Sequence, residues 1–155
     1  MKQRTKEDKL VRYILFYQRL YRTGWKRIAN FLYWQLRIIM SVDIPPQVRM
    51  GKFLRLPHYG LGVVMHPATV IGDHVTIYQS VTIGARGREW HTVVGNNVLI
   101  GAGAKILGSL HVGDNAKIGA NAVVLTDVPA NATAVGVPAS IHATEAAQEE
   151  LPISD

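Results

Sequence analysis

Two histidines, His58 and His91, have the residue type and the position in the sequence to carry out chemistry. Imidazole titrates near neutral pH, so a histidine can accept a proton from a substrate hydroxyl without a large pKa shift. His58 follows Pro57 and lies outside the regular aliphatic pattern of the chain, which favours a catalytic role over a core position. His91 ends an irregular stretch of the same pattern. The chain of 155 residues has no cysteine, which excludes a thiolate nucleophile and a zinc–cysteine site.

The elements that must position these histidines follow a strict period of six residues. Ten aliphatic residues share this register, in two runs with one interruption: Met65, Ile71, Ile77, Ile83, then Val94, Ile100, Ile106, Val112, Ile118 and Val124. A period of six fits neither an α-helix nor an alternating strand. It is typical of a hexapeptide β-helix, in which about three short faces close one coil. We therefore predict a mainly β fold whose stacked coils enclose a column of aliphatic side chains.

The β-helix is predicted over residues 41–142, with two irregularities. A change of register near residues 60–64 indicates a small insertion, and residues 85–93 interrupt the repeat completely. Insertions leave a solenoid as loops and often carry its binding function. We expect the repeat to end after Val128 and residues 143–155 to form a mobile, polar tail.

Residues 1–40 form a basic segment with a different pattern. Ten of the 17 Lys and Arg residues lie here against two acidic residues, while the whole chain carries a net charge of +6. Apolar residues at three- and four-residue steps over residues 6–40 predict α-helices, with a break near Gly24. The charge favours an anionic partner, or else a solvated helix face. No nucleic-acid-binding module accompanies it, so nucleic acid is not an expected partner.

The apolar run at residues 28–40 is too short to span a bilayer, which takes about 20 residues. One alternative is an interfacial helix with Tyr33 and Trp34 at a membrane surface. The other is a face that packs on the end of the β-helix or on a neighbouring subunit. Charged residues recur through the first 27 positions, which does not fit a secretory signal. We expect a cytoplasmic protein, and attachment to the inner face of the membrane is a further hypothesis.

Several motifs are more specific than the repeat. They are Val-Asp-Ile-Pro-Pro at 42–46, Leu-Pro-His-Tyr-Gly at 56–60, Tyr-Gln-Ser-Val-Thr-Ile-Gly at 78–84, His91, Ile-Gly-Ala-Gly-Ala-Lys-Ile-Leu-Gly at 100–108, and Ala-Val-Gly-Val-Pro-Ala at 134–139. With them the chain resembles the serine acetyltransferase branch of the hexapeptide-repeat acyltransferases over residues 41–141. The resemblance implies a homotrimer of left-handed parallel β-helices, with acetyl-CoA as co-substrate between neighbouring subunits.

The same resemblance assigns catalytic roles. It implies that His58 removes a proton from the acceptor hydroxyl, that Asp43 orients this histidine, and that His91 helps to hold the acceptor. A carboxylate on the second ring nitrogen would fix the tautomer and stabilise the imidazolium as it forms. The alternative for Asp43 is a turn cap before Pro45, where aspartate is common.

The resemblance also implies a cofactor cleft with small residues. Gly84, Ala102 and Ala120 match positions where the family's backbone contacts the pantetheine arm, and Lys117 lies near the nucleotide end, where a cation suits phosphate. Backbone N–H groups at Gly84 and Ala85 are candidates for stabilising the oxyanion. The alternative is that these residues fit tight coil corners. We predict no metal site.

Two departures from the family pattern bear on the acceptor. Pro57 replaces the acidic residue before the catalytic histidine, and Trp90 replaces the arginine before the loop histidine. Losing both partners of a free amino acid would weaken its recognition. Trp90 could stack on a sugar ring, with Arg86 and Arg88 binding hydroxyls or acidic groups. The leading hypothesis is therefore O-acetylation of a saccharide hydroxyl in surface-polysaccharide biosynthesis.

Three alternatives stay open. The first is serine O-acetylation, the activity that supplies cysteine biosynthesis, with Arg86 or Arg88 in place of the missing arginine. The second is a metal site between subunits, formed by His58, His66 and His91. The third is a non-catalytic trimeric scaffold that docks through its basic helices.

Overall fold

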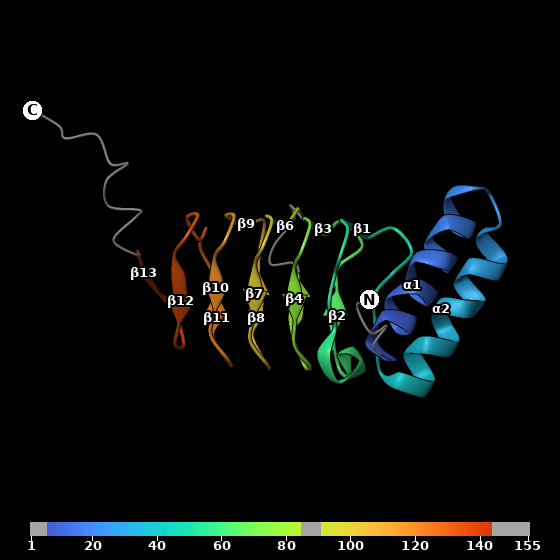
Figure 1. Cartoon of the computed structure of the whole chain (residues 1–155), viewed down its shortest axis with the longest axis horizontal. Coiled ribbons are helices and arrows are strands. Elements are labelled where there is room, and N and C mark those ends of the chain that lie inside the picture. Colours follow the sequence, from blue (N-terminus) through green and yellow to red (C-terminus); the bar gives the residue numbers. More distant parts are fainter. Residues whose placement is uncertain (1–5, 85–90, 144–155) are drawn as a thin grey trace, which may run out of the picture.

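The computed structural model describes residues 6–84 and 91–143, which form two helices at one end of a stack of flat coils (Figure 1). Helix α1 (Lys6–Arg22) and helix α2 (Lys26–Met40) pack on each other as a helical pair. Gly24 lies between them with a φ of 97°, a conformation that glycine adopts without steric cost. The predicted helices and the break between them are confirmed.

The strands that follow are short, and they build three sheets with parallel pairing inside each. The first sheet contains β1 (Arg49–Met50), β3 (Val70–Ile71), β6 (Val93–Val94) and β9 (His111–Val112). The second contains β4 (Thr76–Ile77), β7 (Leu99–Ile100), β10 (Lys117–Ile118) and β12 (Thr133–Val135), with β13 (Ser140–His142) antiparallel at its end. The third contains β2 (Val64–Met65), β5 (Thr82–Gly84), β8 (Lys105–Leu107) and β11 (Val123–Val124). The predicted parallel β-helix is confirmed.

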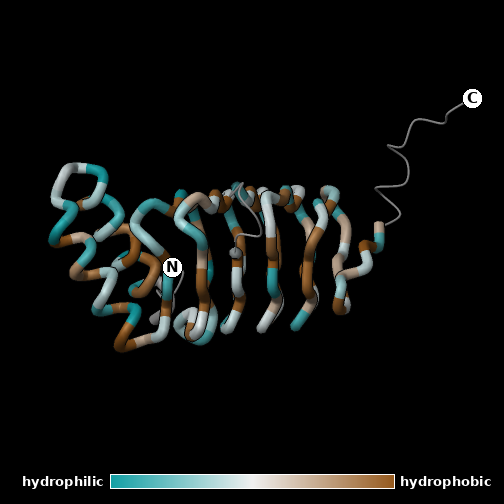
Figure 2. The backbone as a smooth tube through the Cα atoms, turned by 180° about the vertical axis from the view of Figure 1, so that it is seen from behind, coloured by the Kyte–Doolittle hydropathy of each residue, from teal (hydrophilic) through white to brown (hydrophobic). Residues whose placement is uncertain are grey.

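The core of the β-helix is the column of aliphatic side chains that the period of six predicts. All ten residues of the register are buried, with at most 2% of their surface exposed. Ile77, Ile100 and Ile118 pair across successive coils, so the same side-chain type stacks along the axis. Figure 2 shows apolar positions recurring from coil to coil. Each such side chain stabilises the fold by about 1.5–3 kcal/mol through burial.

Coil length shows where the repeat departs from its period. An ordinary coil is a whole number of repeats and carries the chain from Leu99 to its neighbour Lys117. The first coil is longer, since Arg49 pairs with Val70, and its insertion contains the short turn segment η1 (Pro57–Gly60). The coil that includes the irregular stretch is longer still, running from Val70 to Val93.

The last coil of the β-helix lies within the predicted range of residues 41–142 but beyond the expected end of the repeat. The repeat does not stop after Val128, because Lys117 pairs in parallel with Thr133 in a last, shortened coil, and Ala132 and Ala134 are buried. This coil is shorter than an ordinary one by less than a full repeat, so it loses the six-residue register and the period could not reveal it. Strand β13 then covers the last parallel strand, which shields an open sheet edge from pairing with other chains.

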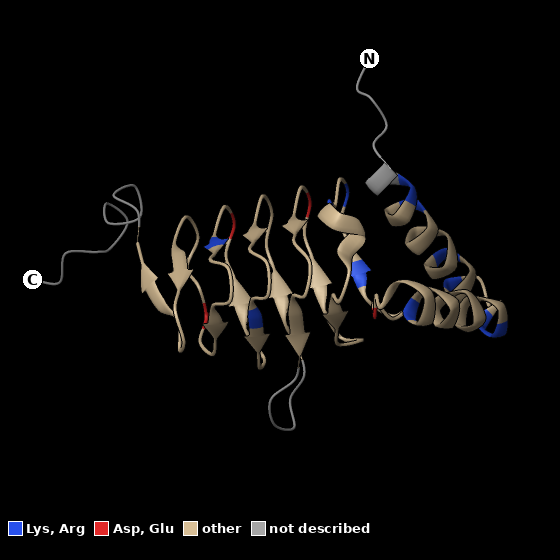
Figure 3. Ribbon diagram, turned by 90° about the horizontal axis from the view of Figure 1, so that it is seen from below, with Lys and Arg blue, Asp and Glu red and all other residues tan. Residues whose placement is uncertain are grey.

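The helical pair covers the opposite end. Helix α1 buries Leu10, Ile14 and Tyr17, and the Tyr17 hydroxyl donates a hydrogen bond of 2.5 Å to the Ile44 carbonyl at the start of the β-helix. Helix α2 buries Ala29 and Leu36. Lys and Arg positions recur along both helices (Figure 3). No helix among the described residues is long and apolar enough to cross a membrane.

Candidate active site

The three sheets meet at corners that stack into long edges, and the two predicted histidines lie on different edges. The chain passes from the first sheet to the second and then to the third in every coil. The His58 edge joins the second sheet to the third and consists of residues 57–63, 78–81, 101–104 and 119–122. The His91 edge joins the third sheet to the first and consists, among the described residues, of residues 44–48, 66–69, 91–92, 108–110 and 125–127. One chain therefore does not bring His58 and His91 together.

His58 lies in the insertion of the first coil and is exposed. Its φ of 53° and the 56° of Tyr59 fall in the left-handed region, which is uncommon for two successive residues other than glycine. Corner residues such as Ser80 and Asn121 adopt the same conformation. A positive φ is therefore a property of tight coil corners, whereas two successive non-glycine residues with positive φ occur, among the described residues, at η1.

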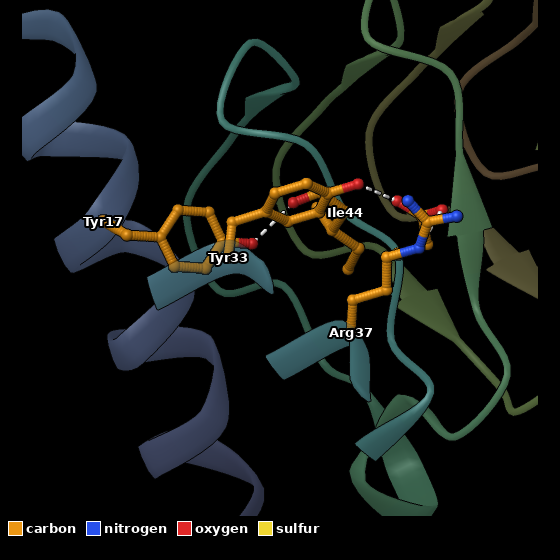
Figure 4. Close-up of polar contacts among 5 residues, drawn as sticks. Tyr17, Tyr33, Arg37 and Ile44 are labelled. Carbon is orange, nitrogen blue, oxygen red and sulfur yellow. Dashed lines mark hydrogen bonds and ion pairs between the residues drawn. The ribbon is translucent and has the colours of Figure 1, made fainter. Parts of the chain in front are cut away.

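Asp43 is held by the helical pair. Its backbone pairs with the third sheet, since its N–H donates to the Val63 carbonyl at 2.8 Å. Among the described residues, the partners of its carboxylate are the Tyr33 hydroxyl on Oδ1 and the Arg37 guanidinium, whose Nε lies 3.3 Å from Oδ2 (Figure 4). The predicted contact between Asp43 and His58 is not among the contacts of this carboxylate, and neither is a cap on the turn at Pro45.

The two tyrosines near Asp43 keep their protons. Burial, followed by the hydrogen bond to Asp43, raises the pKa of Tyr33 to about 12. Burial raises the pKa of Tyr17 even further above its ordinary value. Both hydroxyls are therefore hydrogen-bond donors at any physiological pH, Tyr33 to the Asp43 carboxylate and Tyr17 to the Ile44 carbonyl.

His91 is exposed on the other edge and adjoins a small pocket. Its backbone N–H donates to the Ser109 hydroxyl at 3.2 Å. The pocket has a volume of about 250 Å³ and is lined by Gln47, Arg49, Pro67, Ala68, Thr69, Val70 and His91. The Thr69 hydroxyl is buried without a hydrogen-bond partner among the described residues. Arg49 and His91 thus offer two groups that can bind a carboxylate.

The residues predicted to contact the cofactor are spread along the His58 edge and beside it. Ala102 and Ala120 occupy equivalent corners of successive coils, where the Asn121 N–H donates to the Ala102 carbonyl at 2.8 Å. At a strand spacing of about 4.8 Å they lie roughly 10 and 14 Å along the edge from His58. Gly84 ends β5, and Lys117 is exposed on β10.

Several predicted site residues lie outside the described residues. They are Ala85 at the loop edge and the acceptor candidates Arg86, Arg88 and Trp90. Residues 1–5 of the basic segment and residues 144–155 of the tail lie outside them as well. Within residues 6–84 and 91–143, no three His, Asp or Glu side chains are grouped closely enough to hold a metal ion.

Sequence reasoning missed Tyr33, Arg37 and Arg49. Tyr33 and Arg37 are four residues apart, so they lie on one face of α2, and this spacing close before Asp43 is the signal that was present. Arg49 carries no comparable signal, because its place beside His91 results from the stacking of coils that are far apart in the chain.

Comparison with known proteins gives a consistent result. The family model described as bacterial transferase hexapeptide (six repeats) matches residues 91–126. The serine acetyltransferase of Helicobacter pylori strain 26695 is 49% identical over 112 residues, which cover 70% of this chain and 65% of the relative. That of strain J99 is 48% identical over 115 residues, covering 72% and 67%. The chain spans about two thirds of the length of these relatives and about half of others.

Solved structures agree in fold. The soybean serine acetyltransferase apoenzyme is 39% identical with a TM-score of 0.80, covering 86% of this chain and 56% of that protein. The Neisseria gonorrhoeae enzyme in complex with serine is 40% identical with a TM-score of 0.80, covering 84% and 54%. A serine acetyltransferase in complex with CoA is 39% identical with a TM-score of 0.76, covering 86% and 55%. The fold that this chain shares with these proteins is the left-handed β-helix.

These relatives overturn the saccharide prediction. Proteins 39–49% identical to the chain are serine acetyltransferases, which contradicts an acceptor in polysaccharide biosynthesis and supports the alternative, serine. Pro57 and Trp90 depart from the family pattern at only two positions. The sequence identity, by contrast, is measured over the whole matched region and so includes most of the coils. The match to the family model and the identity to its members establish that the chain belongs to the serine acetyltransferase branch of the hexapeptide-repeat acyltransferases.

Proposed function

We propose that this protein is an acetyl-CoA-dependent serine O-acetyltransferase. The observation that carries the proposal is the His58 edge, where an exposed histidine in an insertion stands in line with the small residues Ala102 and Ala120. Small side chains leave the backbone accessible, so an extended pantetheine arm can lie along this edge with its thioester near His58. The family relationship identifies acetyl-CoA as the acyl donor, since one solved relative is a complex with CoA.

In the proposed reaction, the His58 imidazole accepts the proton of the serine hydroxyl as the oxygen attacks the thioester carbonyl. The tetrahedral intermediate collapses by breaking the carbon–sulfur bond, and the imidazolium returns the proton to the CoA thiolate. An alcohol is a poor nucleophile at neutral pH, so this general base is expected to supply a factor of about 10²–10⁴ in rate. Asp43 stabilises the imidazolium, as a neighbouring carboxylate does in other base-assisted acyl transfers.

For the acceptor we propose the pocket beside His91. A free serine needs a cation for its carboxylate, and the family's arginine at the position before His91 is replaced by Trp90. Arg49 lines the same pocket as His91 and can provide a bidentate grip on a carboxylate. Arg49 thus takes the carboxylate-binding role for which Arg86 and Arg88 were the candidates from the sequence.

The separation of the two histidines favours assembly. His58 and His91 lie on different edges of one β-helix, so a site that uses both needs the His58 edge of one chain against the His91 edge of another. A threefold ring closes this head-to-tail contact and repeats it at every interface. We therefore propose a homotrimer with acetyl-CoA and serine bound between subunits, in which an isolated chain is inactive.

Release of CoA thiol from acetyl-CoA in the presence of L-serine tests the function. We expect serine-dependent release that falls about 10²–10⁴-fold in His58→Ala and is unchanged in His111→Ala, an exposed histidine on another face. Arg49→Gln should raise the KM for serine about tenfold or more, whereas Arg55→Gln, also exposed, should not. Serine-independent hydrolysis alone, or full activity in His58→Ala, would overturn the proposal.

We also propose that the helical pair binds an anionic membrane surface. The outer face of helix α2 exposes large apolar side chains, which are Trp25 at its start, Ile28, Phe31, Trp34, Ile38 and Ile39. Arg19, Arg22, Lys26 and Arg27 are exposed at the turn between the helices. A second copy of the same basic surface would bring like charges together, whereas an acidic lipid surface complements them and accepts the aromatic side chains. Binding to vesicles is the property that tests this second candidate.

A further inference from the structure

We propose that Tyr33 and Arg37 are positioning residues that hold the Asp43 carboxylate for the acyl-transfer reaction. The helical pair would then be part of the catalytic machinery rather than a cover for the end of the β-helix. This inference rests on the proposed function, in which Asp43 supports His58. It concerns residues outside the hexapeptide repeat and outside the motifs that the sequence analysis identified.

Both oxygens of the Asp43 carboxylate have a partner on α2. The Tyr33 hydroxyl donates to Oδ1, and the Arg37 Nε lies 3.3 Å from Oδ2 (Figure 4). A carboxylate rotates readily about its terminal bond, so one donor on each oxygen fixes its plane. An ionised carboxylate has about four lone-pair positions, and two contacts leave acceptor capacity for a histidine.

The Tyr33 side chain is itself fixed in place. Its ring lies 6.2 Å from the Tyr17 ring, centroid to centroid, with the planes tilted by 56°. Tyr17 is fully buried and donates to the Ile44 carbonyl, the residue after Asp43. The raised pKa of Tyr33 keeps its hydroxyl a donor. A rigid ring that carries a permanent donor is suited to orient a carboxylate.

The Tyr33 and Arg37 contacts differ in how strongly they hold the Asp43 carboxylate. The Arg37 side chain is 57% exposed and the Asp43 side chain 21%, so water screens their ion pair. Exposed ion pairs contribute little, whereas a hydrogen bond to a charged group that is shielded from water contributes more. The Tyr33 hydroxyl bond is part-buried. We therefore expect Tyr33 to carry most of the positioning and Arg37 a smaller share.

The segment that Tyr33 and Arg37 hold runs beside the segment that follows His58. The Gly62 N–H donates to the Ser41 carbonyl at 3.0 Å, and the Asp43 N–H donates to the Val63 carbonyl at 2.8 Å. Val63 follows soon after His58, and the Leu61 N–H between them donates back to the His58 carbonyl. Asp43 therefore lies on the strand beside the η1 insertion, which is the placement a supporting carboxylate needs.

The test compares Tyr33→Phe and Arg37→Gln with matched controls in the full-length chain. Tyr13→Phe removes another hydroxyl bond between the helices, to the Leu32 carbonyl, and Arg12→Gln removes an exposed cation of α1. We expect Tyr33→Phe to lower kcat about tenfold with the KM for serine and acetyl-CoA near wild type. Arg37→Gln should lower kcat about two- to threefold, and both controls should match wild type.

A double-mutant cycle with Asp43→Asn separates positioning from general damage. If Tyr33 acts through Asp43, Tyr33→Phe should cause no further loss of kcat in the Asp43→Asn background. An equal loss in both backgrounds, or a Tyr33→Phe enzyme as active as Tyr13→Phe, would overturn the inference. Thermal midpoints measured in parallel identify any variant that is partly unfolded at the assay temperature, and the cycle is then run at a lower temperature.

The controls also separate this inference from the function on which it rests. Loss of serine-dependent CoA release in His58→Ala with an unchanged Tyr33→Phe would sink the positioning role and leave the function in place. Absence of serine-dependent release in wild type would remove the function itself.

Discussion

The β-helix and the helical pair bury their apolar side chains to different extents. In the β-helix every coil contributes aliphatic side chains to one column, and the ten residues of the register are all buried. In the helical pair, α2 buries Ala29 and Leu36 while large apolar side chains such as Phe31 and Ile39 remain exposed, Ile39 to 77%. The β-helix completes its core within one chain, whereas the helical pair leaves large apolar side chains exposed.

The comparison also shows where the candidate site residues lie. Ordinary coils carry aliphatic side chains inside and small or polar residues at their corners. His58 and His91 belong to the two coils that are longer than the rest, which run from Arg49 to Val70 and from Val70 to Val93. The helical pair contributes Tyr33 and Arg37, whose partner Asp43 forms a parallel bridge with Val64 at the start of the β-helix. The regular repeats therefore supply a frame, and the insertions and the helices supply the polar groups.

The largest expected effect concerns the charge of the helical pair. Replacing Arg19, Arg22, Lys26 and Arg27 together by Ala should weaken binding to vesicles of 70% phosphatidylcholine and 30% phosphatidylglycerol by up to about a thousandfold, since each cation near the surface contributes roughly 1 kcal/mol. Sedimentation of protein with vesicles measures the affinity. Added salt should weaken wild-type binding in the same direction, because it screens the charges.

The matched control removes the same charge from the β-helix. Arg49, Lys52, Arg55 and Lys117 are also exposed, and replacing these four by Ala should leave vesicle affinity within about threefold of wild type if the helical pair is the binding surface. Equal losses in the two quadruple variants, or no binding by wild type, would show that membrane binding is not a property of this surface.

The sequence predicted the β-helix better than it predicted the site, for a physical reason. A column of stacked coils imposes its period on the sequence, so spacing alone predicts the burial of Ile77, Ile100 and Ile118. The last coil was missed because its shorter path, from Lys117 to Thr133, departs from the six-residue period. Contacts such as Tyr33 with Asp43 depend on how α2 packs on the first coil, which no local period encodes.

The acceptor prediction failed for a related reason. Trp90 and Pro57 are two single positions, and the loss of the contacts that they replace indicated weaker recognition of a free amino acid. A pocket is built from several elements, and Arg49 reaches the surroundings of His91 from a strand two coils earlier in the chain. Substrate class follows from the set of groups that the fold brings together, and a sequence does not reveal that set when its members come from distant coils.

A second prediction compares a buried position of the β-helix with an exposed apolar position of the helical pair. Ile100 is fully buried in the middle of the column, so Ile100→Ala should lower the free energy of unfolding by about 2–5 kcal/mol through lost burial and a residual cavity. Ile38 is 60% exposed on α2, and Ile38→Ala should change stability by less than about 0.5 kcal/mol. Urea unfolding followed by circular dichroism, at one fixed protein concentration, measures both values.

The outcome for Ile38 carries information in either direction. A small change would agree with an outer face of α2 that is free in the assembled protein. A loss as large as that of Ile100→Ala would mean that this face is buried between chains in solution, and the contrast between the two regions would then hold for the single chain alone.

The smallest expected effect is the response of the helical pair to alkaline pH. Tyr33 has its pKa raised from 10 to about 12 in the folded protein, chiefly by burial and then by its bond to Asp43. The folded state therefore holds the phenol proton more tightly than the unfolded chain does. This contribution to stability is fully present below pH 10 and is lost as the pH rises from 10 through 12. Tyr17 acts in the same direction.

Tyr33→Phe should accordingly reduce the decline of unfolding free energy between about pH 9 and pH 11.5, whereas Ile100→Ala should shift stability by the same amount at both. Urea unfolding at the two pH values, with phenolate absorbance recorded on the folded protein, measures the difference. A Tyr33→Phe variant whose stability falls as steeply as that of wild type would place the alkaline sensitivity elsewhere. Because the aliphatic column carries no titratable group, any pH dependence that Tyr33→Phe removes must arise where α2 meets Asp43.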